Sequence, residues 1–553
     1  MSSHDETDVL VIGAGAGGAA VSKRLSDAGI KVTCLEQGDW FHSLDHPHFH
    51  REWEIERQRA WSFEPNVRQL PEDYPCGGNT TPFMMNGVGG STLHYAGAWP
   101  RFKPVDFRRG TEHGLEGTID WPISYEELEP FYAINDAEVG VARFVGDPAN
   151  PTRPHGLTTG LPAGKLGLKM AKAFDELGWH WWPAENAILR KPRDGRLPCN
   201  HCGPCLSGCP RGSIASADVA YWPPAVRNGV DLRTNARVEQ INVQNGRATG
   251  ATYVDRVTET RREIKARLVV LAANAIGTPR LLLMSAQAGH PHGLANTNGL
   301  VGRHLMFHSW SFEDFWFDEP TEDYKGNVAA ALYSQTFYNS DVDRGFVNGF
   351  SLQVGRGYGS AYTALGTTTG HAAPWGAGHR KFFNDHFGRH ILVYVQGEDL
   401  PTATNRVTLD PTLVDSSGLP APHVFYELHE NDRKLVAYGR ERAIEAGQAA
   451  GGLRDAASTG ITGVDGPPPG WHIMGTCRIG NTPEDSVTNK YHQTWDVPNL
   501  FIADASSLPT GGAVNPTSTL QSMAVRCAEY IKRRHTDILG QTTTPSNADA
   551  PQF

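Results

Sequence analysis

The sequence contains no long hydrophobic run and no excess of positive charge, and both absences narrow the class of protein. Every apolar stretch is shorter than the roughly 20 residues that a membrane-spanning helix needs. Lysine and arginine number 50 against 60 aspartates and glutamates, which gives a formal net charge of -10 at pH 7. Nucleic acids and anionic membranes repel a chain of this sign. We therefore expect neither a nucleic-acid partner nor direct insertion into a membrane.

The N-terminal segment lacks the features of an export signal. It has neither a positive n-region nor a twin arginine, and it leads directly into an apolar strand. We therefore expect a cytoplasmic protein unless a partner carries it out. With 553 residues and 39% hydrophobic residues, the chain has the length and composition of a globular protein of two or three domains.

Cysteine is scarce, yet half of it is concentrated in one short run. Cys199, Cys202, Cys205 and Cys209, followed by Pro210, are four of only eight cysteines. Their spacing, C-x2-C-x2-C-x3-C-P, is the run with which bacterial ferredoxins hold iron–sulfur clusters. One zinc ion, or structural disulfides in an exported protein, would also suit four such residues. The run predicts an iron–sulfur cluster, with zinc and purely structural cysteines as the alternatives.

Four histidines also stand close together. They are His42, His46, His48 and His50, and they surround Pro47 in a polar stretch. Histidines at close spacing can bind a metal ion. The proline and the polar neighbours favour a solvated loop instead.

Glycine, by contrast, is abundant, and its first cluster is the most informative. The β-branched run from Val9 to Ile12 predicts a buried parallel strand with a helix after it. Between them, Gly13, Gly15 and Gly18 form the pattern G-x-G-x-x-G. In a dinucleotide fold the first glycine permits a tight turn, the second lets the backbone approach a pyrophosphate, and the third lets helix and strand pack closely. The pyrophosphate then lies at the helix N-terminus.

A second strand completes this pattern. Residues 31–35 are largely apolar and end at Glu36, where an acidic side chain would receive the ribose hydroxyls of an adenosine half. Strand, turn, helix, second strand and acid together predict dinucleotide binding rather than a plain glycine-rich turn. The acid favours FAD or NAD over NADP.

The same domain returns later in the chain. Residues 268–272 form another apolar strand, and a helix is expected over 275–284. Residues 300–465 instead alternate aromatic and polar residues, which suits an antiparallel sheet. Near the C-terminus an apolar run ends at Asp504, beside which phosphate or ribityl hydroxyls would lie, and a helix is expected from about Thr519.

Several of these stretches together resemble the glucose–methanol–choline (GMC) oxidoreductases. The matching stretches are the N-terminal dinucleotide turn, a second glycine turn at Gly89, Gly90 and Ser91, the strand and helix over 268–280, and two C-terminal stretches at 471–480 and 499–519. The resemblance implies FAD as the cofactor. It assigns to the cofactor site, besides the residues of the first turn, Gly89, Gly90, Ser91, Val238, Asp504 and Thr517.

The resemblance also implies the catalytic pair. His472 stands in an H-x-x-G-T stretch and would be the catalytic acid/base, with Asn515 as its partner. Oxidising an alcohol moves a hydride to the flavin and removes a proton from the hydroxyl, and an imidazole can accept that proton near neutral pH. The Asn515 amide could hold the same oxygen. A lone histidine without such a resemblance would more often be a packing or capping residue.

His94 has two interpretations. Some members of the family bind FAD covalently through a histidine four residues beyond the corresponding glycine pair, which is where His94 stands. Other members have a histidine there that only packs or forms hydrogen bonds near the flavin.

Within the family, residues 395–410 and 418–422 are most similar to the flavin subunits of bacterial sugar dehydrogenases. The similarity implies oxidation of an alcohol group, in a sugar or glycoside, with electrons passed to an acceptor other than NAD through a small subunit or a cytochrome. Some of those subunits carry an iron–sulfur cluster, and some leave the cell for the periplasm with a small partner. The alternatives are an oxidase that produces hydrogen peroxide, a lyase that binds FAD, and a non-catalytic electron carrier.

We therefore predict an α/β protein with a discontinuous Rossmann-like FAD-binding domain and a substrate domain built on an antiparallel sheet. The FAD-binding domain is expected to comprise residues 1–130, 190–300 and 466–535. The substrate-side domain is expected to comprise residues 131–189 and 301–465. Residues 536–553 are expected to be a disordered tail.

Overall fold

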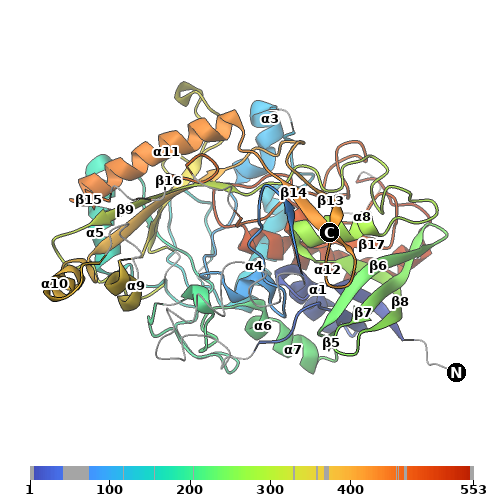
Figure 1. The fold of residues 1–553 in the computed structure, drawn as a ribbon. Coiled ribbons are helices and arrows are strands. Elements are labelled where there is room, and N and C mark those ends of the chain that lie inside the picture. The colour runs from blue at the N-terminus through green and yellow to red at the C-terminus, as the bar shows by residue number, and fades with distance from the viewer. Residues whose placement is uncertain are drawn as a thin grey trace.

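The computed structural model describes residues 5–41, 74–115, 117–154, 156–203, 205–327, 330–356, 359–366, 373–455, 458, 460–465 and 470–547. Two seven-stranded sheets organise this part of the chain (Figure 1). A three-stranded sheet accompanies them, made of β3 (Gly77–Gly78), β13 (Arg406–Val414) and β14 (Pro420–Phe425).

The first sheet carries the predicted dinucleotide turn. Its strands, in spatial order, are β5 (Asp231–Arg233), β2 (Val32–Leu35), β1 (Glu6–Ile12), β8 (Thr260–Leu271), β7 (Arg247–Asp255) and β6 (Ala236–Gln244), with β17 (Leu500–Ile502) paired to β8. β1 runs parallel to β2 and β8, and β17 is also parallel to β8. Strands from three distant parts of the sequence thus share one sheet, which confirms the discontinuous Rossmann-like fold.

The second sheet is antiparallel, as the alternating pattern of residues 300–465 predicts. Its strands, in spatial order, are β15 (Leu453–Arg454), β9 (His308–Trp316), β12 (His390–Glu398), β11 (Phe350–Gly355), β10 (Leu332–Ser334) and β4 (Trp182–Pro183), with β16 (Gly460–Ile461) paired to β9. Helix α11 (Glu430–Ala449) lies along this sheet (Figure 1). Gly439 and Gly447 bring the helix close, because a Cβ at either would fall within 2.7 Å of a β12 or β9 side chain.

The other helices surround the two sheets. They are α1 (Ala16–Ser26), α3 (Arg109–His113), α4 (Tyr125–Val139), α5 (Gly164–Leu177), α6 (Ala217–Ala220), α7 (Trp222–Arg227), α8 (Asn274–Met284), α9 (Ser360–Leu365), α10 (Ala377–His386) and α12 (Thr517–Gly540). In the described residues, no helix is both long and apolar enough to cross a bilayer.

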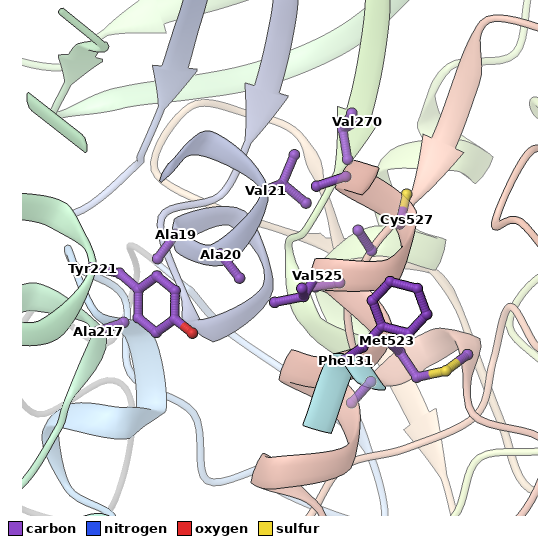
Figure 2. Packing of buried hydrophobic residues seen from close by; sticks show 14 of the residues in the cluster. Ala19, Ala20, Val21, Phe131, Ala217, Tyr221, Val270, Met523, Val525 and Cys527 are labelled. Carbon is purple, nitrogen blue, oxygen red and sulfur yellow. The ribbon is translucent and has the colours of Figure 1, made fainter. Parts of the chain in front are cut away.

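Helices α1 and α12 pack together against the first sheet. Figure 2 shows Ala20 of α1 facing Val525 of α12, and Val21 of α1 beside Val270 of β8. Small side chains on α1 allow the close approach, and burial of this apolar surface is the main source of stability here. The contact also holds the N-termini of both helices at one edge of the sheet.

Two expectations about segment ends need correction. The boundary predicted at 130/131 falls inside α4, whose Tyr132 hydroxyl lies 2.7 Å from the Thr519 hydroxyl of α12. The predicted disordered tail is wrong for residues 536–547, since α12 continues to Gly540 and Thr544 donates a hydrogen bond to the Thr494 carbonyl at 2.6 Å. Polar side chains in residues 536–547 form hydrogen bonds with neighbouring loops, which is why polar composition was a poor guide to disorder.

A buried ion cluster fastens α4 to the chain on both sides of it. Asp136 is 5% exposed, and its Oδ2 accepts hydrogen bonds from Arg101 and Arg143, each at 2.6 Å. Burial raises the pKa of Asp136, but the two guanidinium groups outweigh burial, and the pKa lies below its usual value. Its Oδ1 also accepts a bond from the Trp99 indole at 2.9 Å.

Replacing Asp136 with alanine should be strongly destabilising. The change removes the shared counter-ion of two buried guanidinium groups, and breaking such a cluster costs about 3–5 kcal/mol. We expect a clear fall in Tm by scanning calorimetry. Glu176→Ala, which removes the exposed pair with Lys172, should leave Tm nearly unchanged. Equal Tm values for the two variants would contradict the structural role of the cluster.

Candidate functional site

One cavity of about 660 Å³ extends along the carboxyl ends of the first sheet's parallel strands to the second sheet. At one end it is lined by Gly13, Glu36 and Val238, and at the other by Trp310 and His472. Ligands of open α/β folds bind at the carboxyl ends of such strands. The cavity therefore places the residues predicted for the dinucleotide and the predicted catalytic histidine in one continuous space.

The two glycine turns meet on the wall of this cavity. A Cβ at Gly90, whose φ is +54°, would lie 2.9 Å from Gly15 Cα, so the two backbones are in close approach. A Cβ at Gly15 would meet nothing nearer than Gly90 Cα at 3.9 Å. The space beside Gly15 is thus a cradle that a side chain would fill and an extended phosphate group could occupy.

Glu36 closes the same end of the cavity. Its Oε2 accepts a hydrogen bond from the Ala14 amide at 2.8 Å and its Oε1 accepts one from the Gly38 amide at 2.9 Å. Burial raises the pKa of Glu36 above its usual value, and the backbone amides oppose that rise. The carboxylate is therefore fixed where it could accept hydrogen bonds from a ribose.

Two helix N-termini open into the cavity. Helix α1 begins after Gly15 and α12 begins after Pro516, and neither has a side-chain cap. Their first amides are suited to bind anionic groups such as phosphates. Asp504 lies nearby, with its Oδ2 accepting a bond from the Thr278 hydroxyl at 2.6 Å.

Most residues predicted for the cofactor line the cavity. These are Gly13, Gly15, Glu36, Gly90, Ser91, His94, Val238, Asp504 and Thr517. Gly18 and Gly89 instead allow close packing, since a Cβ at Gly18 would lie 1.9 Å from the Gly13 carbonyl oxygen and one at Gly89 would lie 3.1 Å from Leu93. The open cradle, the fixed acid and the uncapped helices fit FAD.

The predicted catalytic side chains meet at the other end. Asn515 Nδ2 lies 3.3 Å from His472 Nε2. Asn515 Oδ1 accepts hydrogen bonds from the Tyr333 hydroxyl at 3.2 Å and from Gln353 Nε2 at 3.3 Å, which turns the amide NH₂ toward His472. His472 Nδ1 contacts His308 Nδ1 at 2.9 Å.

His472 has an uncommon backbone and an altered pKa. Its φ is +58°, in the left-handed region that few residues other than glycine adopt and that is enriched at functional sites. Burial, with a smaller contribution from His308, lowers the pKa of His472 well below its usual value. The imidazole is therefore neutral near pH 7 and able to accept a proton.

The loop that carries Asn515 is held by a buried polar cluster. The Gly512 amide donates to Glu398 Oε1 at 3.1 Å, and Glu398 Oε2 pairs with Arg109 at 2.7 Å. The Ser351 hydroxyl donates to the Ala513 carbonyl at 2.7 Å. Strands β11 and β12 thus fix the loop before the chain enters α12.

The aromatic walls around His472 were not predicted from the sequence. Trp310 lies 5.3 Å from the His472 ring and Trp471 lies 5.0 Å from Phe83, measured between ring centroids. Phe312 and Tyr394 line the same end of the cavity. The alternation of aromatic residues near residue 310 predicted a strand. It did not predict which face of that strand lines the cavity.

The cysteine run gives no support to a metal centre. All eight cysteines belong to the described residues and are free thiols, and Cys199, Cys202, Cys205 and Cys209 line one small cavity of about 20 Å³. In the described ranges, however, no three His, Cys, Asp or Glu side chains are arranged to hold a metal ion. The described residues therefore do not support the predicted iron–sulfur cluster or zinc. His42, His46, His48 and His50 lie outside the described residues.

Comparison with known proteins identifies the family. Models of the GMC oxidoreductase family match residues 7–310 and 401–524. A 2-methyl-1,2-propanediol dehydrogenase from Mycolicibacterium austroafricanum is 61% identical over 553 residues, covering 100% of this chain and 99% of that protein. The fructose dehydrogenase large subunit of Gluconobacter japonicus is 28% identical over 95% of this chain and 97% of its own length.

Solved structures share the fold at lower identity. A formate oxidase from Aspergillus oryzae superposes with a TM-score of 0.67 at 14% identity, over 97% of this chain and 100% of that chain. Pyridoxine 4-oxidase superposes with a TM-score of 0.62 at 17% identity, over 96% of this chain and 99% of that chain.

Proposed function

The chain belongs to the GMC oxidoreductase family, and from this premise we propose that it oxidises a hydroxyl group of a small branched alcohol or diol to a carbonyl and passes the electrons to an acceptor other than NAD. The observation that carries the proposal is the His472–Asn515 pair on the wall of the same cavity that holds the dinucleotide cradle. Family membership implies FAD, which when bound accepts a hydride from the carbinol carbon.

His472 and Asn515 handle the proton and the oxygen. His472 is neutral, so its ring can accept the hydroxyl proton as hydride leaves the carbon. The Asn515 amide nitrogen lies 3.3 Å from His472 Nε2, so it could donate a hydrogen bond to the same substrate oxygen and would stabilise negative charge that develops there. Both groups are held in place before substrate enters, which lowers the cost of orienting them.

The walls favour a compact substrate. Trp310, Phe312 and Tyr394 surround the position next to His472, and such apolar walls exclude water and suit hydrocarbon groups. The relative at 61% identity acts on a small branched diol, whereas the sugar dehydrogenases share 27–28%. We therefore prefer a small diol to the sugar or glycoside that the sequence resemblance implied.

Anaerobic titration tests the proposal. Protein purified without air is mixed in turn with 2-methyl-1,2-propanediol, 2-methylpropan-1-ol, fructose and gluconate, and the visible flavin absorbance is recorded. Bleaching by the branched alcohols is expected. Bleaching by the sugar compounds alone would overturn the substrate class, and absence of flavin bands would overturn the cofactor.

The same sample distinguishes the remaining alternatives. Rapid reoxidation by air with formation of hydrogen peroxide would indicate an oxidase, and turnover without bleaching would indicate a lyase.

Acid precipitation decides the role of His94, which lies on the cavity wall with its Nδ1 3.1 Å from the Leu206 carbonyl. Flavin retained in the pellet requires a covalent bond, whereas released flavin excludes one. The described cysteines give no support to a metal centre, so the proposed electron path does not include them.

A further inference from the structure

A second histidine, His308, contacts the ring of the proposed catalytic residue His472. His308 is the first residue of β9 and is fully buried. Its Nε2 lies 2.7 Å from the Gly512 carbonyl oxygen, and its Nδ1 lies 2.9 Å from His472 Nδ1. The two rings meet edge to face, at 87° with centroids 4.9 Å apart. His308 is thus bonded through both ring nitrogens.

The hydrogen-bond partners decide where each proton resides. A carbonyl oxygen can only accept, so His308 Nε2 must carry a hydrogen. Burial lowers the pKa of His308 to about 4, so the ring is neutral at pH 7 and its Nδ1 carries only a lone pair. The contact between the two Nδ1 atoms then requires the hydrogen to be on His472. Neutral His472 consequently has its lone pair on Nε2, the nitrogen that faces Asn515.

We propose that His308 is the positioning residue that fixes His472 in the tautomer with hydrogen on Nδ1 and the lone pair on Nε2, so that the base is ready to accept the substrate proton. The inference rests on the proposed function and deepens it. When His472 takes the hydroxyl proton at Nε2, its Nδ1–H strengthens its bond to His308 Nδ1, because that hydrogen bond becomes charge-assisted. No proton needs to pass to His308 for this to occur.

The protein holds His308 firmly for this role. Strand β9 pairs with β12, and His308 stands opposite Glu398 in the register. Glu398 accepts the Gly512 amide hydrogen bond, while His308 donates to the carbonyl of the same residue. Gly512 is therefore held by hydrogen bonds at both its amide and its carbonyl. The loop that presents Asn515 and the ring that orients His472 are parts of one assembly.

Nitrogen NMR of histidine-labelled holoenzyme tests the tautomer directly. His472 is assigned by the loss of its signals in His472→Asn. At neutral pH we expect wild-type His472 to carry hydrogen on Nδ1, and we expect that fraction to fall in His308→Phe. Wild-type His472 with hydrogen on Nε2 would overturn the inference, whatever the enzyme's substrate proves to be.

Kinetics test the consequence for catalysis. We expect His308→Phe to lower kcat by roughly 10- to 100-fold with little change in KM or in bound flavin, the usual effect of losing the partner that orients a working histidine. His308→Asn should restore most of the rate, since the amide oxygen can accept the His472 Nδ1–H.

The control is His390→Phe, which removes another buried histidine of this sheet that bonds Asp314 rather than His472. Equal loss in His308→Asn and His308→Phe would overturn the inference, as would equal loss in the control. An alcohol that fails to bleach wild-type flavin would instead contradict the proposed function and leave the NMR result valid.

Discussion

Replacing His472 with asparagine should lower kcat by roughly two to four orders of magnitude, the usual contribution of a general base. Asparagine suits this test because it tolerates the left-handed backbone that His472 adopts at φ +58°. The variant removes the proton acceptor but preserves the turn. The measurement is the anaerobic rate of flavin bleaching by the best alcohol of the panel, with the flavin content of each preparation determined first.

The matched control is His492→Asn. His492 is also a fully buried histidine in the left-handed region, with φ +69°, and its Nδ1 bonds the Ile502 carbonyl at 2.8 Å. It does not belong to the cavity walls. We expect the control to bleach at nearly the wild-type rate. Loss of flavin together with activity in His472→Asn would make His472 a structural residue, and unchanged activity would indicate an electron carrier.

The dinucleotide turn could be predicted from sequence because its signals are local. The strand ending at Ile12, the turn at Gly13 and the acid at Glu36 lie within a short stretch, and each follows from propensity and spacing. Antiparallel pairing of residues 300–465 could also be predicted, since period-2 alternation is a local property. Burial in both sheets agrees with these patterns.

The catalytic end depends on contacts that no local pattern records. His308 and His472 are 164 residues apart, and Asn515 is another 43 residues along. Family resemblance supplied His472 and Asn515, but His308 is simply one more residue of an alternating strand until β9 is placed beside the loop. The tail shows the reverse error, because local polarity predicted disorder where Thr544 bonds a distant loop. Contacts between residues far apart in the sequence determine both the position of His308 and the order of the C-terminal segment.

Replacing Gly15 with valine should greatly weaken flavin binding while leaving the apoprotein folded. Gly15 has an extended backbone, with φ -72° and ψ -164°, so a side chain is sterically allowed. Its Cβ would meet only Gly90 Cα, at ordinary contact distance, and the valine side chain would occupy the cradle beside Gly15. We expect the purified variant to lack visible flavin absorbance and to bind added FAD more than about 100-fold more weakly, a steric cost near 3 kcal/mol.

The contrast with Gly18 separates cofactor binding from folding. A Cβ at Gly18 would lie 1.9 Å from the Gly13 carbonyl oxygen, where neither partner can move without opening the turn. Gly18→Ala should therefore yield unfolded or insoluble protein, whereas Gly15→Val should yield soluble protein with wild-type circular dichroism. Flavin retained by Gly15→Val would show that FAD does not approach the backbone at this turn. If both variants are insoluble, Gly15 is also needed for packing. The smaller Gly15→Ala variant then tests the cradle. If the cradle holds the pyrophosphate, this variant should fold and bind FAD more weakly than the wild type.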